Sequence, residues 1–166
     1  MLNDEEYMKL ALAEARKAYE LGEVPIGAVL VSHEDGTVVS AGHNLRETSL
    51  DATSHAEMEA IRLGCRRLGR WRLSGCTLYV TIEPCAMCAG ALVNSRVDRL
   101  VYGSSEPRFG AVESIFNVVN HKVLNHHMEV TAGVLEEECR AIMKDFFRMR
   151  RRQNKERNRL HTVLGK

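Results

Sequence analysis

Two short motifs constrain this chain most strongly, His55-Ala56-Glu57 and Pro84-Cys85-Ala86-Met87-Cys88. One imidazole and two thiolates can bind a zinc ion and leave its fourth position for water, as catalytic sites do, whereas structural zinc sites are closed by four protein ligands. His55 and Cys85 are 30 positions apart. The chain must therefore fold so that two separate segments meet.

Glu57 adds the proton-transfer group that such a site needs. Zinc lowers the pKa of a water towards neutrality, and a neighbouring carboxylate can take the proton and pass it to a leaving group. The combination H-x-E with P-C-x-x-C is a known signature of zinc nucleobase deaminases. We interpret His55, Cys85 and Cys88 as zinc ligands and Glu57 as the catalytic acid–base. Two alternatives stay open, a zinc-free core and a closed zinc site completed by Cys65, Cys76 or Cys139.

Length and composition indicate one globular domain. The 166 residues fit a single domain, and 45% hydrophobic residues are enough to bury a core. No apolar run approaches the roughly 20 residues that span a bilayer. The acidic start, residues 1–6, lacks the charge pattern of a signal peptide. We therefore expect a cytoplasmic protein with no membrane association.

Charge is distributed unevenly along the chain. Residues 144–166 carry nine Lys and Arg against Asp145 and Glu156, a net charge of +7, whereas the remainder carries 14 against 20, a net charge of −6. A basic arm on an acidic body fits a polyanionic partner, although a solvated helix end with a floppy tail fits equally well. We expect a domain over residues 1–152 and a flexible basic tail over residues 153–166.

Hydrophobic periodicity predicts alternating helices and strands. Asn3 and Glu6 form a capping-box pattern before the first helix, which Gly22 ends. The apolar run 26–31 predicts a strand buried on both faces, and Asp35-Gly36 a tight turn to its partner. The other expected elements are a strand at 37–42, a helix capped by Thr53 or Ser54, a strand at 76–82, a helix from Cys85 to about Ser95, a strand at 98–102, a short helix at 112–119, a strand at 128–131 and a helix from about Leu135.

This element order predicts the fold class. Helices between successive strands imply parallel pairing and helices on both faces of the sheet. We expect an α/β fold, a three-layer α/β/α sandwich with a five-stranded mixed sheet. Both metal motifs then lie at helix starts, where the partial positive charge of the helix favours the thiolates of Cys85 and Cys88. Asn44 ends a strand at the same edge, where we expect its amide to contact substrate, with a plain turn role as the alternative.

Longer strings of the sequence resemble the bacterial tRNA-specific adenosine deaminases, within the cytidine and deoxycytidylate deaminase superfamily. The resemblance extends over roughly residues 4–152, nearly the whole chain. It rests on Leu21-Gly22-Glu23-Val24-Pro25-Ile26-Gly27-Ala28-Val29, His43-Asn44-Leu45-Arg46-Glu47-Thr48, His55-Ala56-Glu57, Trp71-Arg72-Leu73, residues 77–91 with the Pro84-Cys85 motif, and Asp145-Phe146-Phe147-Arg148.

The resemblance implies an activity and a set of contacts. Members convert adenosine to inosine at the wobble position of a tRNA anticodon, as homodimers with one zinc ion per subunit. The implied zinc ligands and acid–base are those named above. By similarity, Val24, Asn44 and the backbone around Ala56 and Glu83 hold the adenine. The implied anticodon-loop contacts on the last helix are Phe147, Arg148, Arg150 and Arg151.

One loop departs from the family pattern. Members commonly carry Asp-x-Lys-x-Gly after the fourth strand, where this chain has Glu106-Pro107-Arg108-Phe109-Gly110, and Glu113 replaces a usually small residue. We expect Glu106 and Arg108 to contact the nucleotide, so substrate choice is the open point. The alternatives are a deaminase of cytosine, guanine, a free nucleoside or single-stranded DNA, including an engineered variant, and an inactive zinc-binding RNA module.

Overall fold

Five strands form one mixed sheet in the order β2-β1-β3-β4-β5. In this computed structural model, which describes residues 1–165, β1 pairs antiparallel with β2 and β3, whereas β3, β4 and β5 run parallel. The strands are β1 Gly27–Ser32, β2 Val38–His43, β3 Cys76–Ile82, β4 Arg99–Ser104 and β5 Glu129–Ala132. The predicted five-stranded mixed sheet is confirmed.

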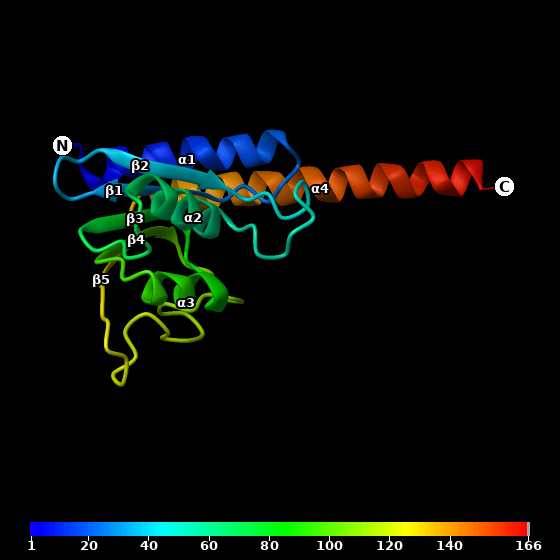
Figure 1. The fold of residues 1–166 in the computed structure, drawn as a ribbon. Helices are drawn as coiled ribbons and strands as arrows, with labels where there is room; N and C mark the ends of the chain where they lie inside the picture. Colours follow the sequence, from blue (N-terminus) through cyan, green and yellow to red (C-terminus); the bar gives the residue numbers. More distant parts are fainter. Residues whose placement is uncertain (166) are drawn as a thin grey trace.

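Helices cover both faces of the sheet (Figure 1). The helices α1 (Asp4–Glu20) and α4 (Glu136–Leu164) pack on one face, and α2 (Ala56–Leu68) and α3 (Ala86–Asn94) on the other. Neighbouring strand residues alternate between the two cores: Leu30 packs in the core of the α2–α3 face, and Val29 packs in the core of the α1–α4 face. The predicted three-layer sandwich is therefore confirmed.

The starts of α1 and α2 are built differently. Asn3 and Glu6 form the predicted capping box, with Asn3 Oδ1 accepting from the Glu6 N–H at 2.9 Å and Glu6 Oε2 from the Asn3 N–H at 2.8 Å. The predicted cap of α2 is wrong, because His55 occupies the N-cap position and makes no side-chain capping bond. Ser54 instead donates its hydroxyl to Glu59 at 2.7 Å. The first turn of α2 thus keeps its backbone N–H groups free of a side-chain cap.

Gly42 allows α2 to approach the sheet closely. A Cβ at Gly42 would lie 2.6 Å from the carbonyl oxygen of Ala56 and 2.8 Å from the backbone nitrogen of Ala60. Real Cβ atoms do not approach backbone atoms so closely, so any side chain at this position must push the first turn of α2 away. That turn follows His55 and contains Glu57.

The predicted short helix at residues 112–119 is wrong. Between β4 and β5 the chain forms turns and irregular backbone, with no helix over residues 105–128. The backbone N–H groups of Val112, Glu113 and Ser114 donate to the carboxylate of Glu83 instead. Successive N–H groups that converge on one anion form a nest, which competes with helical hydrogen bonding.

The C-terminal segment is more regular than the sequence predicts. Instead of an irregular tail from residue 153, α4 continues to Leu164 as an exposed helix that projects beyond the rest of the molecule (Figure 1). Residues 151–164 include no Gly or Pro and are rich in Arg, Asn and Leu; no breaker interrupts the helix begun on the sheet. The domain boundary at residue 152 stays a prediction, and Lys166 lies outside the described residues.

No helix within residues 1–165 combines the length and the apolar character needed to cross a membrane.

We predict opposite stability changes for two Gly→Ala substitutions. Gly42→Ala should lower the free energy of unfolding by about 1–3 kcal/mol, because it overpacks the contact between β2 and α2. Gly90→Ala, within α3 and with no heavy atom within 4 Å of the added methyl group, should raise it by up to about 1 kcal/mol. Urea unfolding of both variants checks this, and equal effects would contradict the assigned close approach.

Candidate active site

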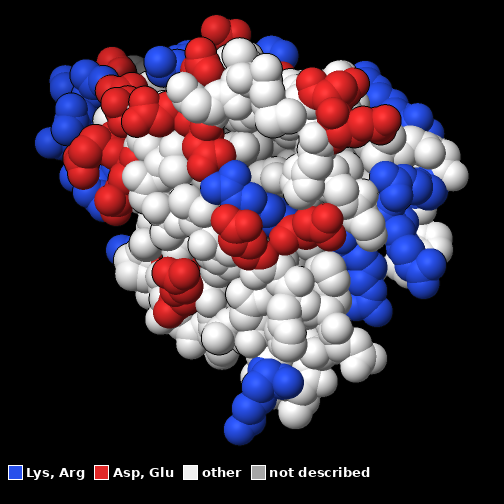
Figure 2. Space-filling model, turned by 90° about the vertical axis from the view of Figure 1, so that its left-hand side faces the viewer, with Lys and Arg blue, Asp and Glu red and all other residues white. Residues whose placement is uncertain are grey.

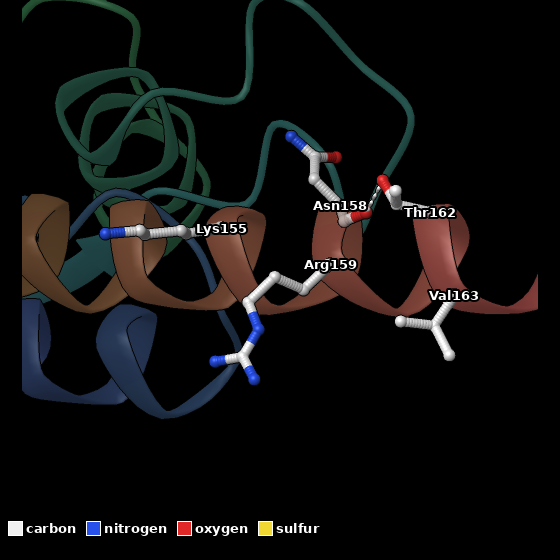
Figure 3. Close-up of a pocket in the computed structure, with 5 residues that line it drawn as sticks. All are labelled: Lys155, Asn158, Arg159, Thr162 and Val163. Atoms are coloured by element: carbon white, nitrogen blue, oxygen red, sulfur yellow. Dashed lines mark hydrogen bonds between the residues drawn. The ribbon is translucent and has the colours of Figure 1, made fainter.

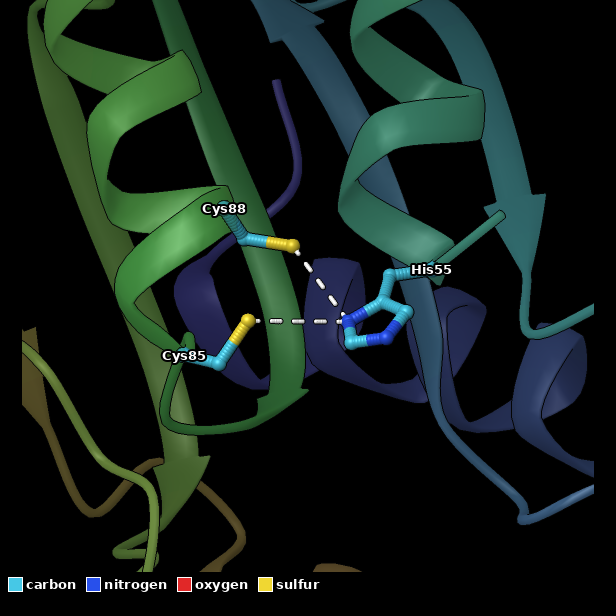
Figure 4. A group of neighbouring side chains, drawn as sticks. All are labelled: His55, Cys85 and Cys88. Carbon is cyan, nitrogen blue, oxygen red and sulfur yellow. Dashed lines mark hydrogen bonds between the residues drawn. The ribbon is translucent and has the colours of Figure 1, made fainter. Parts of the chain in front are cut away.

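Two helix starts meet at one edge of the sheet. Because β1 pairs antiparallel with both β2 and β3, strands β2 and β3 run in the same direction and end at the same edge. The helix after β2 starts at His55 and the helix after β3 starts at Cys85, each an N-cap with extended backbone. Figure 4 shows His55 pointing from the start of α2 towards Cys85 and Cys88.

The three predicted ligands lie at coordination spacing. His55 Nδ1 is 3.6 Å from the Sγ atoms of both Cys85 and Cys88 (Figure 4), and all three atoms lie within 4.8 Å of one another. Zinc bonds of about 2.3 Å to sulfur and about 2.0–2.1 Å to nitrogen, at a tetrahedral angle, place N and S about 3.6 Å apart. The donor set therefore fits zinc. Within residues 1–165 the cluster includes none of Cys65, Cys76 and Cys139, so the closed-site alternative has no fourth ligand here.

Glu57 lies beside this cluster in a buried position. Its residue is only 4% exposed, and burial raises the pKa of its carboxyl group to about 7. A carboxyl group poised near neutral pH can both accept and donate a proton. This is the behaviour expected of the predicted acid–base.

The two thiols have pKa values shifted in opposite directions. The hydrogen bond from Cys88 lowers the pKa of Cys85 to about 4, with His55 adding to the effect. The same hydrogen bond, with burial, raises the pKa of Cys88, and the hydrogen bond to Cys85 raises the pKa of His55. A bound cation would stabilise both groups as thiolates.

A buried carboxylate holds the loop after β4. Glu83, 3% exposed, accepts hydrogen bonds from the N–H groups of Glu106 at 3.1 Å, Val112 at 3.1 Å, Glu113 at 2.9 Å and Ser114 at 3.0 Å. The Ser114 hydroxyl also donates to it. Burial alone would raise the pKa of Glu83, but these hydrogen bonds outweigh burial and lower it.

A second buried carboxylate holds the loop before α2. Glu23, 2% exposed, accepts from the N–H groups of Glu47 at 3.1 Å and Thr48 at 2.8 Å. Sequence reasoning missed the anchoring role of both acidic side chains. The sequence signal for this role was an acidic residue one or two positions before a proline at the edge of an apolar segment. Glu83 directly precedes Pro84, and Glu23 precedes Val24-Pro25.

The predicted adenine-contacting residues gather near the same edge. Asn44 is buried; its Nδ2 donates to the carbonyl of Val24 at 3.2 Å, and its Oδ1 accepts from the Arg46 N–H at 3.1 Å. Its amide thus stabilises a turn, the alternative role considered above. Ala56 is buried in the first turn of α2. Substrate contacts by Val24, Asn44, Ala56 and Glu83 stay predictions.

The predicted nucleic-acid contacts divide into two groups. Glu106 and Arg108 lie in the loop anchored by Glu83, where the Glu106 carboxylate accepts from the Arg108 N–H at 2.9 Å. Phe147, Arg148 and Arg151 are exposed on α4. Arg150 differs, because it donates to the carbonyl of Gly22 and its guanidinium lies 5.2 Å from the ring centre of Phe146. Arg150 therefore fastens α4 to the turn that follows α1.

The charge pattern differs between the two ends of the molecule. Figure 2 shows the end opposite the projecting helix, where acidic and basic side chains are interspersed. On α4, Arg148, Arg152, Lys155 and Arg159 follow at spacings of four, three and four residues and so share one face. A shallow groove on the exposed part of α4 (Figure 3) is lined by Lys155, Asn158, Arg159, Thr162 and Val163. It is open helix surface and shares no residue with the metal cluster.

The fold and the His-Cys-Cys-Glu arrangement are those of a deaminase whose site could hold a metal ion, and comparison with known proteins agrees. The MafB19-like deaminase family matches residues 2–151. A tRNA-specific adenosine deaminase of Bacillus subtilis is 51% identical over 155 residues, 93% of this chain and 95% of that protein. The chain belongs to the tRNA-specific adenosine deaminase family.

Solved structures extend the comparison. One, from a study of A-to-I editing by tRNA:A34 deaminases at the wobble position of transfer RNA, superposes with a TM-score of 0.78 at 46% identity, covering 82% of this chain and 98% of that chain. A guanine deaminase of Bacillus subtilis superposes with a TM-score of 0.59 at 39% identity, covering 63% of this chain and 66% of that chain. The predicted cytidine deaminase-like fold and the predicted family are confirmed.

We predict that Glu83→Gln lowers the free energy of unfolding by about 2–4 kcal/mol at pH 7, because the amide group would face four N–H donors. The folded-state pKa of Glu83 is lowered, so its stabilising effect is complete above the unfolded pKa of about 4.3 and is lost as the pH falls through the folded value. Urea unfolding from pH 7 to pH 3 should show the difference between the two proteins narrowing below about pH 4. A difference independent of pH would contradict the role of the ionised carboxylate.

Proposed function

We propose that this protein deaminates adenosine to inosine at the wobble position of a tRNA anticodon loop, using one zinc ion held by His55, Cys85 and Cys88. The single observation that carries this proposal is the convergence of these three side chains beside the buried carboxyl group of Glu57. The family to which the chain belongs supplies the substrate class, since its relatives are named tRNA-specific adenosine deaminases.

The chemistry divides between the metal and Glu57. When bound, zinc polarises a water and lowers its pKa, and the reaction converts adenosine and water to inosine and ammonia. Glu57 takes a proton from that water and delivers it to the departing amino group. The near-neutral pKa of Glu57, raised by its burial, suits a group that must carry the proton in both directions.

The remaining predicted residues bind the substrate in this proposal. Val24, Asn44 and the backbone at Ala56 and Glu83 hold the flipped adenine. Glu106, Arg108, Phe147, Arg148 and Arg151 contact the surrounding RNA, while Arg150 contributes through its fixed position on α4. We further propose that the protein acts in the cytoplasm as a homodimer with one zinc ion per subunit.

Deamination of another base is the second candidate. It is favoured by the structural similarity to a guanine deaminase. An ammonia-release assay on a tRNA panel, with adenosine, cytidine, guanine and single-stranded DNA alongside, separates the candidates. Activity confined to a free base would overturn the proposed RNA substrate.

Two variants should separate metal binding from proton transfer. Glu57→Gln should keep about one zinc ion per chain and lose about 10²–10⁴-fold in deamination of a tRNA anticodon stem-loop, because the acid–base is absent. Cys88→Ser should lose both metal and activity, whereas the control Cys65→Ser, outside the cluster, should lose neither. Metal analysis and inosine quantification check this. Glu57→Gln activity within tenfold of the unaltered protein would contradict the assigned role.

The exposed arginines of α4 should contribute to RNA affinity through phosphate contacts. Replacing Arg148 and Arg151 together by Gln should weaken binding and reduce the slope of log K against log salt concentration by about 1.4–1.8. Arg140→Gln is the control, since Arg140 is paired with Glu136 and Glu137. Fluorescence anisotropy over a salt series measures both quantities. An unchanged slope would place these arginines away from the RNA.

A further inference from the structure

We propose that Phe109 is a base-stacking platform for a nucleotide that flanks the target adenosine. The inference deepens the proposed function and rests on its RNA substrate. Phe109 is 67% exposed, although a phenylalanine usually gains free energy from burial. In contrast, Phe146 on α4 is 1% exposed. An aromatic ring held in water beside a nucleic-acid site has an obvious partner in an unstacked base.

The loop around Phe109 is held in one conformation. The N–H of Gly110 donates to the carbonyl of Glu106 at 2.8 Å, and the N–H of Arg108 donates to the side-chain carboxylate of Glu106 at 2.9 Å. Pro107 restricts the backbone between them. A Cβ on Gly110 would lie 2.4 Å from the carboxyl carbon of Glu83, so the turn is shaped around that side chain. The backbone that carries Phe109 is therefore ordered before RNA binds, which lowers the conformational cost of binding.

The same loop is fastened directly to the metal-binding segment. The Ala111 N–H donates to the carbonyl of Pro84 at 2.8 Å, and the Glu106 N–H donates to Glu83 at 3.1 Å. Glu83 and Pro84 are the two residues immediately before Cys85. Two anchors on either side of Phe109 thus connect it to the residues that begin the metal site. The turn that carries the ring is thereby held in place relative to Cys85.

Two neighbouring side chains of the turn could contact a phosphate and the base next to it. Arg108 is exposed beside Phe109 and can pair with a phosphate while the ring stacks on the adjoining base. Stacking of one base on an aromatic side chain contributes about 1–3 kcal/mol.

The test measures Kd by fluorescence anisotropy for the full-length zinc-loaded protein in a Glu57→Gln background, which prevents conversion of the RNA. The ligand is an anticodon stem-loop RNA, together with copies in which each base flanking the target is replaced by an abasic nucleotide. Phe109→Leu should raise Kd for the intact RNA about 5–150-fold, the equivalent of one lost stack. Phe109→Tyr should restore affinity, since it restores the ring.

One abasic RNA identifies the stacked base. At that position Phe109→Leu should cause no further loss, because the partner of the ring is already absent. The matched control is Trp71→Ala, an exposed aromatic residue, 57% exposed, in the turn before β3, at the opposite end of that strand from Cys85.

Three results would overturn the proposal. Phe109→Leu could leave Kd unchanged, it could cost the same on every abasic RNA, or it could change the sedimentation of the free protein, which would assign the ring to a protein contact. If the Glu57-intact protein forms inosine in the RNA while Phe109→Leu has no effect, only the stacking site fails. If the Glu57-intact protein neither binds nor converts the RNA, the proposed function fails as well.

Discussion

The structure depends on the meeting of two helix starts at one edge of the sheet. His55 and Cys85 belong to segments 30 residues apart, and they meet because β2 and β3 end at the same edge with β1 between them. Gly42 sets how closely the first turn of α2 approaches β2. Sheet order and helix packing thus bring the imidazole nitrogen to 3.6 Å from each sulfur.

Two buried carboxylates extend this arrangement to the surroundings of the site. Glu23 and Glu83 are almost fully buried. Each carboxylate accepts hydrogen bonds from backbone N–H groups of a loop that adjoins the metal motif. Charge-assisted hydrogen bonds of this kind are strong, and their number compensates for desolvation of the carboxylate. The two loops are therefore held to the folded core by these hydrogen bonds. The proposed role of Phe109 would let specificity change at an exposed loop position while the buried anchors stay in place.

Sequence reasoning reached the fold and the grouping of His55, Cys85 and Cys88 because both can be inferred from local patterns. The capping box at Asn3, the buried runs and the ligand spacing around Cys85 are readable within a few residues. It failed where a competing side-chain hydrogen bond decides the outcome. The helix predicted at residues 112–119 is absent because Glu83 takes its N–H groups, and the cap of α2 moved to His55 because Ser54 pairs with Glu59. The continuation of α4 could have been predicted from the absence of Gly and Pro in residues 151–164. The high charge of this segment led us to expect a flexible tail instead.

The central claim is that zinc is bound by three protein ligands with one position open to water. X-ray absorption spectroscopy at the zinc edge of the purified, metal-loaded protein tests it most directly. We predict two sulfur ligands at about 2.3 Å and two nitrogen or oxygen ligands at about 2.0–2.1 Å, one of the latter exchanging with added anions. A first shell with three or four sulfur ligands, or one that added anions never alter, would contradict this account.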